Sequence, residues 1–169
     1  ELSEKILFGS SLSEKLSDST GVSWSPDHTC KPNLPARPSR CPGIAFGEVS
    51  QSFPKENLFA DQKIRAQALH YFANHELLAI ELFAWALLSF DEIDEMQTRI
   101  LIRTIGDEQK HLRMYITRIG ELGGAFGDFP LSDYLWSELT QSQSFEAFSA
   151  AMALTFEQAN LDHALYFQS

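Results

Sequence analysis

The chain has little positive charge, few cysteines and no long apolar run. Its 169 residues hold 13 Lys and Arg against 23 Asp and Glu, for a formal net charge of −10. A broad binding face for nucleic acid or an anionic membrane needs clustered Lys and Arg, so we expect neither DNA nor a membrane as a partner. No run of about 18 apolar residues and no charged leader before an apolar segment occurs. This pattern predicts a cytoplasmic protein.

The only two cysteines are Cys30 and Cys41, and both lie in a Pro-rich stretch. Their spacing matches no common zinc or redox motif. We therefore expect free thiols. A disulfide that closes this loop is the alternative, although it would be unusual in a reducing compartment.

The length and the 44% hydrophobic content fit one domain with a proper core. Residues 1–16 carry two short helical patterns, and residues 17–56 hold six of the seven prolines, so this second stretch is expected to be extended or turning. We expect residues 1–56 to wrap the core as an N-terminal segment. Residues 57–169 then form the helical bundle.

Apolar residues recur at helical spacing through most of the second part. One long helix is predicted for residues 61–90, a second follows the polar break at 91–94 and runs to Leu122, and Gly123-Gly124 ends it. A short helix is expected at 131–139, and a last one from Ser144 towards Phe167. The final five residues also match the end of a common protease-cleavage tag. The fold class is therefore all-α, and the short link makes the two long helices antiparallel.

A carboxylate, Glu76, lies on the apolar stripe of the first long helix. Phe72, Ala73 and Ile80, each about one turn away, place it towards the core. An unpaired buried carboxylate takes up a proton or destabilises the fold by several kcal/mol, and a bound metal or a buried base removes that cost. This position therefore predicts a partner for Glu76.

The second long helix carries Glu108-Gln-Lys-His111 on its inward stripe. A Glu and a His at positions i and i+3 point from one face of a helix, and in helical bundles this spacing gives one metal ion an oxygen and a nitrogen ligand. Glu-x-x-His alone is a weak motif. Its value depends on the other candidate ligands.

The last helix adds Glu157, whose neighbours include Ala150 and Ala153, small residues that leave room for a site. One Glu from each of two helices, with Glu-x-x-His from each of two others, is the ligand set of carboxylate-bridged di-iron bundles. Three of these four helices are present here. We expect the fourth, with the second Glu-x-x-His, to be missing from this chain: it follows in the native protein, a second chain supplies it, or the site is incomplete.

Each candidate ligand also has a structural alternative. Glu108 and His111 can form an exposed pair on the helix surface, and Glu157 can be a surface acid. Glu76 can instead form a buried salt bridge. The candidate partners for that bridge are Arg65, Arg99 and Arg103.

Three further residues near the site have polar side chains without an assigned role. His75 and Glu81 are adjacent to the candidate ligands, and such residues more often support a site or the fold than bind the metal. His70 fits a core or capping histidine.

The sequence resembles the ferritin-like family known as domain of unknown function 455. Several spaced motifs carry the resemblance, in the same order and over nearly the whole chain. They are Glu4-Lys5-Ile, Ser13-Glu-Lys-Leu, Pro35-Ala-Arg-Pro38, Arg65-Ala-Gln-Ala-Leu-His70, His75-Glu76-Leu-Leu-Ala-Ile80-Glu81-Leu, Asp107-Glu108-Gln-Lys-His111, Leu122-Gly-Gly-Ala-Phe-Gly127-Asp and Phe156-Glu157-Gln-Ala-Asn-Leu161-Asp162.

The resemblance implies a ferritin-like four-helix bundle with a dinuclear metal site. It places Glu76, Glu108, His111 and Glu157 at the matching ligand positions, and it implies no established reaction. Members continue into a further helix with another Glu-x-x-His, and this sequence ends before it.

We expect a non-haem protein with di-iron, or alternatively di-manganese, that activates dioxygen to oxidise or hydroxylate an unidentified small-molecule substrate. One alternative is iron oxidation and storage, or peroxide scavenging, without an organic substrate. Another is a metal-free helical scaffold. A homo-oligomer would be one source of the missing helix.

Overall fold

The computed structural model describes residues 1–22, 32–47, 53–55 and 58–164, with side chains in the last helix described as far as Thr155. These residues are mostly helical and form no strand, which confirms the all-α prediction. In chain order the elements are α1 (Leu2–Phe8), α2 (Leu12–Lys15), the 3-10 helix η1 (Pro42–Ile44), α3 (Gln62–Ser89), α4 (Glu95–Glu121), α5 (Tyr134–Leu139) and α6 (Phe145–Ala164).

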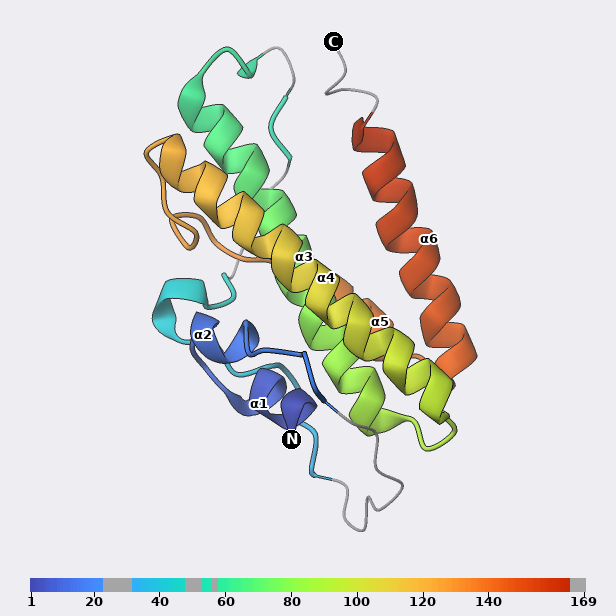
Figure 1. Ribbon diagram of the computed structural model, residues 1–169. Coiled ribbons are helices and arrows are strands. Elements are labelled where there is room, and N and C mark those ends of the chain that lie inside the picture. The colour runs from blue at the N-terminus through green and yellow to red at the C-terminus, as the bar shows by residue number, and fades with distance from the viewer. Residues whose placement is uncertain (23–31, 48–52, 56–57, 165–169) are drawn as a thin grey trace.

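The two longest helices, α3 and α4, form an antiparallel hairpin at the centre of the molecule (Figure 1). Asp61 begins α3 by accepting a hydrogen bond from the amide of Lys63. Asp94 begins α4 in a capping box with Gln97, in which each side chain binds the other residue's backbone N–H. Gly123 follows α4 with a φ of 78°, a conformation that favours glycine. Both predicted helices are confirmed, with ends within one residue of those predicted, and so is their antiparallel orientation.

The N-terminal segment packs against one side of this hairpin (Figure 1). Ile6 and Leu7 of α1 are completely buried. Ser11 caps α2 through a capping box with Glu14. Lys15, at the end of α2, is also completely buried. A short helix pair thus gives the core both apolar side chains and a charge.

The described part of the Pro-rich stretch lies against α1 and α5. The backbone N–H of Ser39 donates to the carbonyl oxygen of Leu7. The indole N–H of Trp136 donates to the carbonyl oxygen of Ala36 at 2.8 Å. Cys41 is a free thiol, as predicted. Cys30 lies outside the described residues.

The short helix predicted for 131–139 begins later, at Tyr134. Leu131 instead pairs with Phe46 in an isolated parallel bridge, and its carbonyl oxygen accepts from the N–H of Gly47 at 2.9 Å. The segment before α5 is therefore extended and not helical. It ties the Pro-rich stretch to the core.

Aromatic rings fix the start of α6 on the core. Phe148 is completely buried, with its ring 5.8 Å from Trp85 and 6.0 Å from Phe90. The N–H of Phe145 donates to the carboxylate of Glu92. Further along, α6 lies apart from α3 and α4 in Figure 1. The described helix ends at Ala164, and the predicted continuation to Phe167 lies outside the described residues.

No helix in the described ranges combines the length and the apolarity that crossing a membrane requires.

Candidate metal centre

Glu76 lies in the middle of α3 and faces α4. Its residue surface is only 8% exposed, and Phe72, Ala73 and Ile80 around it are buried. The apolar character of α3 on most of its sides gives this carboxylate little access to water. The predicted inward placement of Glu76 is therefore confirmed.

Glu108 and His111 meet Glu76 from the neighbouring turns of α4. The Nδ1 atom of His111 lies 2.9 Å from Oε2 of Glu108 and 4.0 Å from Oε2 of Glu76. Glu108 is half-buried, whereas the side chain of His111 is 54% exposed. The i, i+3 spacing thus brings both groups to one face, and this face opens to solvent at His111.

One donor atom from each of Glu76, Glu108 and His111 lies within 4.8 Å of the others. Burial raises the pKa of Glu76 to about 9, with further contributions from its hydrogen bond to Glu108 and from the charge of Glu108. At neutral pH Glu76 therefore keeps its proton. This proton removes the repulsion that two ionised carboxylates would have. A bound cation could do the same in its place.

This donor set fits a transition metal. Atoms that bind one ion at about 2.1 Å lie about 3 to 4 Å apart, so small rotations of the side chains are enough to close the set. Two carboxylates and one imidazole suit iron, manganese or zinc, and the composition alone does not select among them. Metal binding would replace the proton of Glu76.

Tyr115 belongs to the surroundings of this site. Its ring stacks on Phe72 with centroids 5.9 Å apart. Burial raises the pKa of its hydroxyl, and the charges of Glu76 and Glu108 raise it further. Tyr115 was not among the residues predicted for the site from the sequence. Its spacing of four from His111 and seven from Glu108 was the signal, because these positions share a helix face.

The arginines considered as partners of Glu76 have other partners. Arg65 donates to the carbonyl oxygens of Phe59 and Ala60. Arg99 pairs with Glu95, and Arg103 lies 4.0 Å from Asp107. The salt-bridge alternative for Glu76 is thus wrong for these three residues.

The residues beside the candidate ligands have distinct structural roles. Glu81 forms buried ion pairs with Lys15 and Arg40. His75 contacts Tyr71, with ring centroids 4.4 Å apart. His70 is buried and accepts a hydrogen bond from the N–H of Gly127. The structural roles expected for His70 and Glu81 are therefore confirmed.

Glu157 lies in the part of α6 whose side chains are outside the described residues. The residues that precede it on the same face, Ala150, Ala153 and Leu154, are exposed. The structure therefore brings together three of the four predicted ligands, Glu76, Glu108 and His111, and leaves the position of the Glu157 side chain a prediction.

The family described as "Protein of unknown function (DUF455)" matches residues 2–168, nearly the whole chain. No curated protein and no solved structure shows a significant match.

Proposed function

We propose that this chain, which belongs to the family described as protein of unknown function DUF455, is a non-haem metal protein with a dinuclear centre between α3 and α4. The observation that carries the proposal is the convergence of Glu76, Glu108 and His111, whose donor atoms lie within 4.8 Å of one another. The burial of Glu76 beside Glu108 supports it, because two ionised carboxylates at this depth need a positive partner.

When bound, a pair of iron or manganese ions supplies the activation of dioxygen for oxidation or hydroxylation of a small molecule. Glu76 and Glu108 would hold the ions as carboxylates after Glu76 loses its proton. His111 would bind as neutral imidazole, and Nδ1 is the ring nitrogen that faces the two carboxyl groups. The exposed edge of His111 is the side from which small molecules reach the centre.

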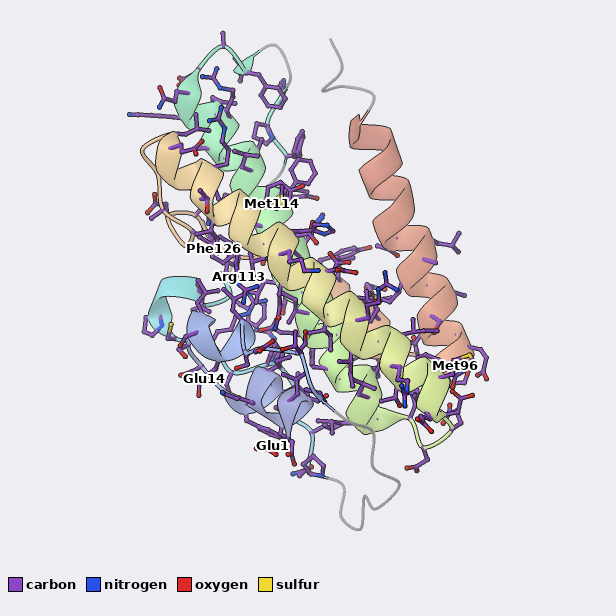
Figure 2. All side chains as sticks on the ribbon, viewed as in Figure 1. Glu1, Glu14, Met96, Arg113, Met114 and Phe126 are labelled. Carbon is purple, nitrogen blue, oxygen red and sulfur yellow. The ribbon has the colours of Figure 1, made fainter. Side chains whose placement is uncertain are left out.

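The proposed fold is a ferritin-like bundle in which a further helix completes the ligand set. Exposed apolar residues support a place for it: Ile100 and Met114 on α4 are 57% and 68% exposed, and Leu154 on α6 is 70% exposed. Figure 2 labels Met114 on the outer surface of α4. In this proposal the further helix brings the second Glu-x-x-His, and Glu157 is the remaining carboxylate. Either another part of the protein or a second chain would supply that helix.

The test is the metal content of the native full-length protein after expression with iron or manganese supplied. We expect a stoichiometric amount of one of these metals. Glu76→Gln, Glu108→Gln and His111→Ala should each lose most of it. Glu121→Gln is the matched control, since Glu121 lies on the same helix and pairs with exposed Arg118.

A metal-free native protein, or equal metal content in all four variants, would contradict the proposal. If metal is bound, iron-dependent oxygen uptake without any organic substrate would indicate iron oxidation in place of hydroxylation.

A further inference from the structure

A second potential site lies on the other side of α4. A groove of about 500 Å³ separates α4 from the N-terminal residues 18–22. Ligand pockets commonly have volumes of about 300 to 1,000 Å³. Four cationic side chains line it: Arg99, Arg103, Lys110 and Arg113.

The segment that faces α4 across the groove is anchored just before residue 18. There, side chains of α4 donate hydrogen bonds to main-chain carbonyl oxygens. Gln109 donates to the carbonyl oxygens of Lys15 and Ser17 at 3.0 and 2.8 Å. Arg113 donates to the carbonyl oxygen of Leu16, and Figure 2 shows it on the side of α4 near α2. Gly106 permits the close approach of Ser19, because a Cβ at position 106 would lie 2.6 Å from Oγ of Ser19. The groove therefore has a defined shape.

The charge of the groove differs in sign from that of the chain. Its lining holds four cations and two carboxylates, Asp18 and Asp107, whereas the chain carries a net charge of −10. The carboxylate of Asp18 accepts hydrogen bonds from the N–H and the hydroxyl of Thr20. Asp107 lies 2.7 Å from Lys110. Exposed pairs of this kind contribute about 0 to 1 kcal/mol, so an incoming anion displaces them easily.

We propose that this groove binds a small phosphorylated molecule. The guanidinium fork of Arg103 and the ammonium of Lys110 suit the oxygens of a phosphate group. The hydroxyl of Ser19, which also lines the groove, adds a donor. Ile102 and Val22 supply an apolar surface for the rest of the molecule.

This site is separate from the candidate metal centre. Asp107 and Lys110 line the groove, and the residues that follow them, Glu108 and His111, face Glu76. The two sites thus occupy opposite sides of the same turns of α4. The proposal does not depend on a bound metal, and its test needs none.

The experiment is a titration of the purified protein with phenyl phosphate and with inorganic phosphate, followed by backbone amide NMR. We expect saturable shifts at Ser19, Ile102 and Gly106, with tighter binding of phenyl phosphate. Arg103→Gln/Lys110→Gln should weaken binding at least tenfold. Both side chains are exposed, so the thermal melting curve should stay close to that of the wild type. Arg118→Gln is the control, because Arg118 lies on α4 and pairs with Glu121 outside the groove.

Shifts that rise linearly and equally with both phosphates and with potassium chloride at matched ionic strength would overturn the proposal. So would equal weakening by Arg118→Gln and by the double variant.

Discussion

The carboxylate of Glu81 lies 3.0 Å from the ammonium of Lys15, and neither side chain has any exposed surface. Arg40 adds two contacts to the same carboxylate, at 2.6 and 3.2 Å, and its guanidinium lies over the ring of Phe46. Burial lowers the pKa of Lys15, and the charge of Glu81 partly opposes that shift. Three charges from three distant segments are thus held together away from water.

The first prediction concerns this buried triad. Glu81→Leu should destabilise the protein by about 3 to 5 kcal/mol, because it leaves the two cations buried without their partner. The triple variant Lys15→Met/Arg40→Met/Glu81→Leu should recover much of that loss, since it removes the charges together. Urea unfolding measures both. Glu95→Leu is the control, because its pair with Arg99 is exposed and should contribute less than about 1 kcal/mol. A triple variant as unstable as Glu81→Leu would contradict this account.

The second prediction concerns Glu76 in metal-free protein. Its pKa rises from 4.5 to about 9 on folding, chiefly through burial. Between these values the folded state keeps a proton that the unfolded state has lost, so stability falls as pH rises. The slope should reach at most about 1.4 kcal/mol per pH unit. Urea unfolding from pH 5 to 9, with chelator present, measures the slope.

Glu76→Gln should flatten that dependence, because the amide cannot ionise and keeps the shape of the side chain. Glu138→Gln, at an exposed position on α5, should leave it unchanged. A slope that survives in Glu76→Gln would assign the effect to another group.

The third prediction concerns His70. Burial lowers its pKa to about 4, and the charge of Asp128 opposes the shift. Its Nε2 accepts a hydrogen bond from the N–H of Gly127 at 2.9 Å, which requires the neutral ring. Imidazole nitrogen shifts at pH 5.5 should show a neutral ring for His70. As pH falls from about 6.5 to 4, the unfolded state gains a proton that the folded state does not, so stability falls. His70→Phe should remove this contribution, and a charged His70 ring at pH 5.5 would contradict the prediction.

The fourth prediction compares two glycines. Gly127 has a φ of 106°, and a Cβ there would overlap the carbonyl oxygen of Gly43. Gly127→Ala should therefore destabilise the protein by more than about 1 kcal/mol. Gly120 lies in α4 with nothing within 4 Å of an added Cβ. Gly120→Ala should be neutral or stabilise by up to about 1 kcal/mol, because alanine favours helix. Thermal unfolding measures the stability of both variants. Equal changes would show that the backbone conformation at Gly127 does not require glycine for stability.

The sequence was sufficient to predict the long helices and the meeting of three candidate ligands. The apolar period of α3 and α4 sets which faces touch, and the spacing of Glu108 and His111 puts both side chains on the contact face beside Glu76. These relations are local, within one helix or across one short connection, so spacing along the chain determines them.

The triad was beyond prediction because its members are far apart in sequence. In the sequence, Glu81 is one more acidic residue near the site, and no local pattern pairs it with Lys15 or Arg40. The exposed face of α6 was missed for a different reason. Ala150 and Ala153 are small and apolar, so their composition fits a packed face as well as an exposed one.

The hydrogen bonds from Gln109 and Arg113 end on carbonyl oxygens of Lys15, Leu16 and Ser17, and no side chain of these three residues takes part in them. Main-chain acceptors are the same whatever residue carries them. Leu16 and Ser17 can therefore change in related proteins without loss of this attachment, whereas Gln109 cannot. Among family members we expect the residue at Gln109 to vary less than those at Leu16 and Ser17.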